Sequence, residues 1–158
     1  AFWFWAPLAG WAEIDYSLAG ATLPATVEGL PVDAGALALA LAFAGCTLGH
    51  IFSPWLKFKG GKGIAVAAAC LVFVFGPLGF LIEIAVFALG IAVTRCVSVG
   101  SIAAAVICPV LALYFYWGQW VPWLIIAATA CVVIWAHRAN IARLRAGTES
   151  RIGQKKEA

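Results

Sequence analysis

Residues 64–94 read IAVAAACLVFVFGPLGFLIEIAVFALGIAVT and contain a single charged residue, Glu83. An apolar stretch of this kind is a candidate membrane-spanning helix, and about 20 residues suffice for one crossing. The stretch is therefore too long for a single crossing. It is divided at Gly76-Pro77, because proline cannot continue the hydrogen bonds of a helix interior. We predict two short spans, at 64–76 and 78–94.

The composition of the whole chain agrees with a membrane protein. It has 158 residues, of which 65% are hydrophobic and 11% are charged, and its mean hydropathy is +1.01. A soluble domain needs far more polar residues to cover its surface. We predict one all-α integral membrane domain over 1–158, with about six apolar spans and a basic cytoplasmic tail. The other spans are at 1–11, 35–52, 98–117 and 120–137, and the tail covers 138–158.

The first residues are unusual for a natural start. The chain begins inside an apolar segment, Ala1-Phe2-Trp3-Phe4-Trp5, and contains no methionine. A signal peptide would begin with a positively charged segment. We therefore interpret 1–11 as the remnant of a span and expect an N-terminal truncation.

The basic residues are segregated. If the spans alternate in direction, the loops at 53–63 and 95–97 and the tail share one side of the membrane, and every Lys and Arg falls there. Cytoplasmic loops carry such an excess of basic residues. We therefore predict a cytoplasmic location for this side and for the C-terminus. The ten residues are Lys57, Lys59, Lys62, Arg95, Arg138, Arg143, Arg145, Arg151, Lys155 and Lys156.

The loop after the second span combines lysines with glycines, since 57–63 reads KFKGGKG and follows Gly49-His50-Ile51-Phe52. Glycines let backbone N–H groups approach an anion, and the next helix adds its positive N-terminal end. Lysines that anchor a helix end at the interface are the alternative, although they leave the interleaved glycines unexplained. We favour a phosphate site. Its candidate residues are His50, Lys57, Lys59, Gly60, Gly61, Lys62 and Gly63.

A second polar cluster, TRCVSVGS at 94–101, contains three further candidates for binding an anion: Arg95, Ser98 and Ser101. A positive-inside arginine followed by a helix-capping serine explains it equally well, and both interpretations can hold together.

A third polar cluster, HRANIARLRAGTE at 137–149, places His137 and Asn140 three residues apart, on one helical face, with Gly147 as the stop. We interpret the cluster as part of a substrate site. The alternative is an amphipathic basic helix whose arginines bind anionic lipid headgroups.

Several other chemistries find no support. Cys46 and His50 stand four residues apart, but two ligands do not make a zinc site. The loop is not a nucleotide P-loop, because Ile64 stands where a hydroxyl would bind magnesium. Neither a Ser/His/Asp constellation nor a His-x-x-x-x-Asp dyad is present. We expect no metal, no cofactor and no nucleic-acid partner.

Four short motifs in register resemble the bacterial acyl-phosphate:glycerol-3-phosphate acyltransferase family. They are Gly49–Phe52, Phe58–Gly63, Thr94–Ser101 and His137–Glu149, and the resemblance covers roughly 35–153. It implies a seven-helix enzyme of the bacterial inner membrane with its active side in the cytoplasm. That enzyme would transfer an acyl group from acyl phosphate to the 1-hydroxyl of glycerol 3-phosphate, giving lysophosphatidate.

The resemblance also implies roles for these residues. Lys62, Ser98, His137 and Asn140 would be catalytic, and the remaining residues of the three clusters would bind substrate phosphate. Three features depart from the family: its first motif has no counterpart here, and Ser53 and Val66 replace a proline and a threonine. A small transporter or channel for an organic phosphate remains the alternative, although only Glu83 is charged within a span.

Overall fold

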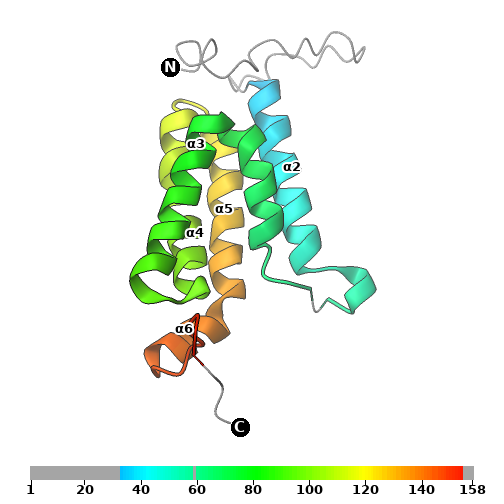
Figure 1. The fold of residues 1–158 in the computed structure, drawn as a ribbon. Coiled ribbons are helices and arrows are strands. Elements are labelled where there is room, and N and C mark those ends of the chain that lie inside the picture. The colour runs from blue at the N-terminus through cyan, green and yellow to red at the C-terminus, as the bar shows by residue number, and fades with distance from the viewer. Residues whose placement is uncertain (1–32, 59, 155–158) are drawn as a thin grey trace.

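The structure is a computed structural model, and it describes residues 33–58 and 60–154. All regular elements in these ranges are helices, which confirms the predicted all-α class. The predicted remnant span at 1–11 and nearly all of the 12–34 loop lie outside the described residues, as does Lys59. The helices, labelled in Figure 1, are α2 (Ala34–Ile51), the short 3₁₀ helix η2 (Pro54–Leu56), α3 (Ile64–Thr94), α4 (Val97–Phe115), α5 (Trp120–Ala136) and α6 (Arg138–Arg145).

Helix α3 is broken at Gly76. This residue has φ 68° and ψ −178°, a conformation that is essentially restricted to glycine. Figure 1 shows that α3 reverses its direction at the end of the bundle opposite α6. The break coincides with the division that Gly76-Pro77 suggests in the sequence. By length and composition alone, three stretches are long and apolar enough to cross a membrane: 35–56, α3 and α4. The pair α5 and α6, bent by 53°, would make a fourth, so the number of crossings remains a prediction.

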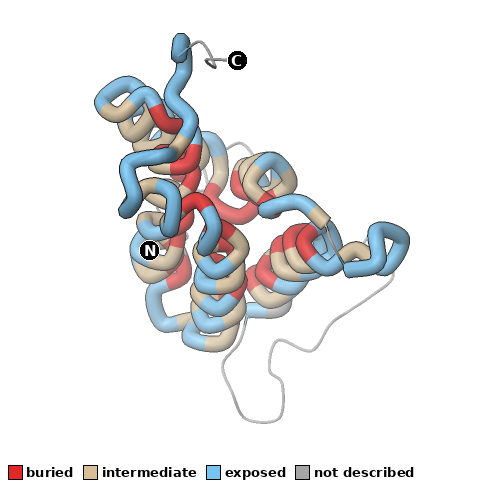
Figure 2. Tube along the Cα trace, turned by 90° about the horizontal axis from the view of Figure 1, so that it is seen from below, coloured by how far each residue is buried: buried red, intermediate tan, exposed pale blue. Residues whose placement is uncertain are grey.

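The helices pack through small residues and a few buried polar contacts. Tyr116 Oη donates a buried hydrogen bond of 2.7 Å to the Val74 carbonyl, which joins α4 to the first part of α3. Gly90 and Gly100 let α3 and α4 approach closely, since a β-carbon on Gly100 would overlap the Phe87 carbonyl. Buried residues line the inside of the bundle and exposed ones its outside (Figure 2). Much of that outside is apolar, as expected for a surface in contact with lipid.

The loops divide into two sets at opposite ends of the bundle. Figure 1 shows the 53–63 loop, the 95–97 turn and α6 at one end, and the turns near Gly76 and Gly118 at the other. The basic residues that the structure describes therefore lie together at the α6 end. We call this end of the molecule the basic end.

Candidate active site

The glycine loop folds back onto the C-terminal end of α2. Gly60 N–H donates to the Ile51 carbonyl at 3.2 Å. A β-carbon on Gly60 would overlap the His50 carbonyl, and one on Gly61 would overlap the His50 ring at Nε2. Glycine is required at position 60 because it meets backbone there, whereas a side chain at position 61 would displace the His50 ring. The structure therefore brings His50 together with the loop, as the sequence predicts.

The loop leads into the N-terminus of α3. Gly63 caps this helix with φ 81°, and its Cα faces Thr47 and Ile51 of α2. The first N–H groups of a helix have no partners within the helix and form a site for anions. Lys62, just before the cap, is exposed. Lys57 is exposed as well, at the end of η2 with φ 52°, and no described contact ties it to the other candidates.

His137 lies immediately beyond α5, whereas the predicted span at 120–137 includes it. Its side chain is 2% exposed, and Nδ1 lies 2.8 Å from the Val133 carbonyl. Because a carbonyl only accepts, Nδ1 carries the proton and Nε2 of the neutral ring is left as an acceptor. Burial lowers the pKa of His137, and the nearby Lys62 ammonium lowers it further, against the raising effects of Val133 and Glu149. These effects together favour the neutral form of the ring, and the charge of Lys62 acts on it from the glycine loop.

The C-terminal cap of α6 positions a carboxylate over Asn140. Gly147, with φ 70°, donates to the Leu144 carbonyl and Thr148 donates to the Arg143 carbonyl, which is the Schellman arrangement. The predicted stop at Gly147 is confirmed. This turn brings the Glu149 carboxylate to 2.7 Å from both Asn140 Nδ2 and Arg143 Nε.

Glu149 is held as an anion. Burial raises the pKa of its carboxyl, but hydrogen bonds from Asn140 and Arg143, together with the Arg143 charge, outweigh that effect and lower the pKa to about 2. Ser98 also lowers this pKa as a nearby donor, although its hydroxyl does not meet the geometry of a hydrogen bond. The second and third clusters therefore meet at Glu149. The segment that follows the third cluster also reaches the second, since the Ile152 N–H donates to the Arg95 carbonyl at 2.8 Å.

The candidates of the second cluster differ in availability. Ser101 is buried, and its hydroxyl donates to the Val97 carbonyl of its own helix at 3.1 Å, so its proton is already engaged. Arg95 is exposed and adopts a left-handed conformation with φ 58°. Ser98 is 6% exposed and its hydroxyl has no hydrogen-bond partner among the described residues. Ser98 is thus the better placed of the two serines to bind a ligand.

Two polar atoms at this junction are buried without partners in the described part of the chain: Ser98 Oγ and Asn140 Oδ1. An unsatisfied buried polar group costs about 1–3 kcal/mol, which a bound ligand with matching groups would recover. Glu149 belongs to the same junction but is absent from the residues predicted for the site. The sequence offered one signal for it, its place at the end of the 137–149 motif.

Comparison with known proteins decides the family. The family model described as glycerol-3-phosphate acyltransferase matches residues 15–147. The chain belongs to this family. Glycerol-3-phosphate acyltransferases of Rhodopseudomonas palustris (strain HaA2) and Synechococcus sp. (strain JA-3-3Ab) are 42% and 47% identical to it, over 77% and 73% of the chain. These matches cover 60% and 56% of the two relatives, so the chain spans somewhat over half of their length.

Solved structures extend the family resemblance to the fold. Two crystal structures of PlsY, an integral membrane glycerol 3-phosphate acyltransferase, match the chain with a TM-score of 0.63 and 28% identity. They cover 75% of this chain, and the match covers 65% and 64% of the two crystallised chains. One is the lysophosphatidic acid form and the other the glycerol 3-phosphate form. The match confirms that the chain has the fold of an integral membrane protein of this family.

Proposed function

We propose that the protein transfers an acyl group from acyl phosphate to the 1-hydroxyl of glycerol 3-phosphate, giving lysophosphatidate for phospholipid synthesis. The observation that carries this proposal is the meeting of the three clusters at the basic end. There, the charge of Lys62 acts on the His137 ring, Asn140 donates to Glu149, and Ser98 lowers the pKa of the same carboxyl. Both substrates are phosphate esters or anhydrides, so a site for them needs cations and N–H donors.

The residues suggest a division of labour. Lys62 and the glycine loop at the start of α3 would bind a phosphate, with His50, Lys57, Lys59 and Arg95 around it. Ser98 and Asn140, each with an unpartnered polar atom, would orient the glycerol phosphate. In the reaction the hydroxyl oxygen attacks the acyl carbon, the bond from that carbon to the phosphate oxygen breaks, and phosphate leaves. His137 Nε2 and a substrate phosphate are two available acceptors for the hydroxyl proton.

The setting proposed for this reaction is the bacterial inner membrane, with the basic end in the cytoplasm. The support comes from the apolar outer surface of the bundle and from the position of the described basic residues at one end. Glycerol 3-phosphate would reach the site from the aqueous phase, and the acyl donor would reach it from the bilayer. We expect glycerol 3-phosphate, acyl phosphate and the lipid bilayer to be the partners of this protein.

The test is acyl transfer by the complete product of the gene, purified in detergent or reconstituted in vesicles. Lys62→Ala and Asn140→Ala should each lower kcat/KM at least about 100-fold, the scale on which one stabilising donor acts. Arg145→Ala, an exposed cation of α6 outside the site, is the matched control and should retain activity. Wild-type rates in both site variants would refute the assignment.

The same vesicles distinguish an acyltransferase from a transporter or channel for an organic phosphate. If the protein is an acyltransferase, vesicles with the protein reconstituted in their membrane should form lysophosphatidate from substrates added outside. Uptake of glycerol 3-phosphate without any acyl transfer would favour the transporter instead.

A further inference from the structure

An apolar cavity of about 270 Å³ lies inside the bundle, between both parts of α3 and helices α2, α4 and α5. Alanines on three helices create the space, because a methyl group leaves room that a larger side chain would fill. They are Ala67, Ala68, Ala104, Ala105 and Ala130. One polar residue, Glu83, lines the cavity, but its carboxyl oxygens are buried away from the cavity surface. The cavity is therefore suited to a hydrocarbon and not to a polar ligand.

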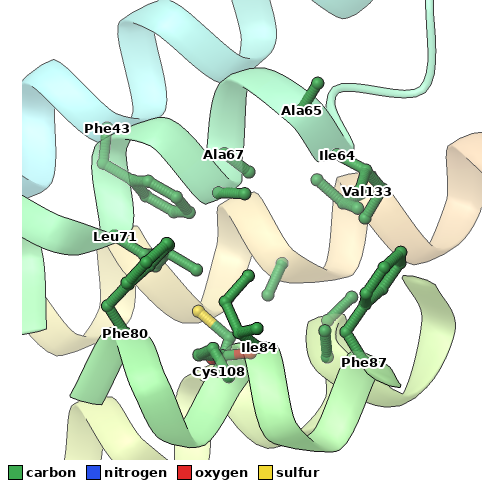
Figure 3. A pocket seen from close by; sticks show the side chains of 15 residues that line it. Phe43, Ile64, Ala65, Ala67, Leu71, Phe80, Ile84, Phe87, Cys108 and Val133 are labelled. Carbon is green, nitrogen blue, oxygen red and sulfur yellow. The ribbon is translucent and has the colours of Figure 1, made fainter. Parts of the chain in front are cut away.

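The cavity begins close to the candidate active site. Ile64 follows Gly63 directly, and Val133 is the residue whose carbonyl accepts from His137. Both residues line one end of the cavity, next to Phe87. Figure 3 shows Ile64, Val133 and Phe87 together at this end. A hydrocarbon chain attached to a group in the active site can thus continue into the cavity without leaving the bundle.

Bulky apolar side chains, two of them aromatic, close the other end. Figure 3 shows Phe43, Leu71 and Phe80 gathered there, away from Ile64 and Val133. Phe80 precedes the end of α3 by fourteen residues, which places it about 21 Å from the basic end along the helix. Phe43 is 2% exposed and packs in the core, so this end is fixed. The distance from the active site to these rings therefore limits the length of any chain in the cavity.

The cavity also opens toward the bilayer. Ala65 and Ile84, which line it from the two parts of α3, are both exposed on the outside of the bundle. Ile84 is 39% exposed. An alkyl chain of a lipid can enter sideways between the two parts of the helix, whereas a polar substrate gains nothing from this route.

We propose that this cavity selects the acyl chain of the donor by length, with Phe80 and Phe43 as the residues that set the longest chain accommodated. The inference rests on the proposed function, since it takes the acyl donor as the source of the chain. A methylene group more or less in an apolar pocket changes discrimination between substrates by about tenfold or more. Removing one phenyl ring should therefore move the preferred length by several carbons.

The test is a profile of kcat/KM against chain length, using acyl phosphates with saturated chains of increasing length and the complete gene product in detergent. Phe80→Ala should raise the ratio of long-chain to short-chain transfer at least about tenfold, and Ala68→Leu should lower it. Leu81→Ala, next to Phe80 but 61% exposed on the outside, should leave the profile unchanged. Phe80→Leu replaces Phe80→Ala if the latter does not fold, with folding followed by thermal unfolding. Identical profiles in all variants would overturn the inference.

A second experiment, photo-cross-linking, tests this inference independently of the proposed function. A long-chain alkyl phosphate with a diazirine near its end should cross-link to residues around Phe43 and Phe80 under light. Cross-links confined to outward-facing residues would overturn the inference, whether or not acyl transfer is observed. An inactive wild-type protein that still cross-links at Phe80 would instead refute the proposed function alone.

Discussion

Glu149 fixes the geometry of the candidate site at the level of single residues. Its carboxylate accepts from Asn140 Nδ2 and Arg143 Nε at 2.7 Å each, and its side chain is only 8% exposed. Hydrogen bonds to a charged group contribute about 1.5–3 kcal/mol. Glu149→Gln should therefore destabilise the protein by about 1–3 kcal/mol and lower acyl transfer, because Asn140 loses its anionic partner. Thermal unfolding in detergent and kcat/KM measure the two effects, and Arg145→Ala, at an exposed residue of α6, is the control.

The same residue predicts a pH dependence. Its pKa is lowered from an ordinary 4.5 to about 2 in the folded protein, so the folded state favours the carboxylate. The stabilisation is complete above about pH 4.5 and is lost as the pH falls through the range from about 4.5 to 2. The difference in unfolding free energy between wild type and Glu149→Gln should shrink over that range. A difference that stays constant down to pH 3 would show that the charge of Glu149 is not what stabilises the cap.

The burial of Glu83 leads to a separate prediction about stability. It is 3% exposed within α3, and neither carboxyl oxygen has a hydrogen-bond partner in the described part of the chain. A buried polar group in that state costs about 1–3 kcal/mol. Glu83→Leu should therefore stabilise the protein by a similar amount, as measured by thermal unfolding, with Leu89→Ala as an outward-facing control. Destabilisation would instead reveal a partner for Glu83 outside the described residues.

Local chemistry explains how far single residues were predictable. His137, Asn140 and Lys62 could be named as candidates from the sequence because their types suit phosphate and proton chemistry, and their roles stay predictions. The role of Glu149 could not, since it depends on the turn that Gly147 makes after α6. The sequence also could not predict that the Ser98 hydroxyl is better placed than that of Ser101 to bind a ligand. This difference depends on which hydroxyl donates back to its own helix, and both serines look alike in the sequence.

At the scale of elements, the break in α3 organises the bundle. Gly76 has φ 68° and ψ −178°, which costs a residue with a β-carbon about 1–3 kcal/mol. Gly76→Ala should thus lower stability by that amount and shift the two parts of α3 relative to each other. Gly45→Ala is the matched control in α2, where a β-carbon meets nothing within 4 Å, and it should be neutral or stabilising by up to about 1 kcal/mol. Equal unfolding temperatures for both variants would contradict this account.

Elements differ in how well the sequence predicts them. The apolar runs and Gly76-Pro77 locate α2, α4 and the break in α3 to within a few residues, because hydropathy and proline act locally. The bend of 53° between α5 and α6 was not predicted. The bend occurs at His137, whose N–H and ring donate to carbonyls of the last turn of α5. No single residue in the sequence predicts it.

The described part of the molecule is polarised, with the basic loops and α6 at one end and the uncharged turns near Gly76 and Gly118 at the other. The positive-inside rule then predicts which end lies in the cytoplasm. In a variant without native cysteines, Trp117→Cys should react with a membrane-impermeant maleimide in intact cells, since Trp117 is 70% exposed at the end opposite α6. Ser150→Cys, exposed beyond α6, should react only after the inner membrane is permeabilised. The reverse pattern would place the site outside the cytoplasm, away from the pool of glycerol 3-phosphate that the proposed reaction needs.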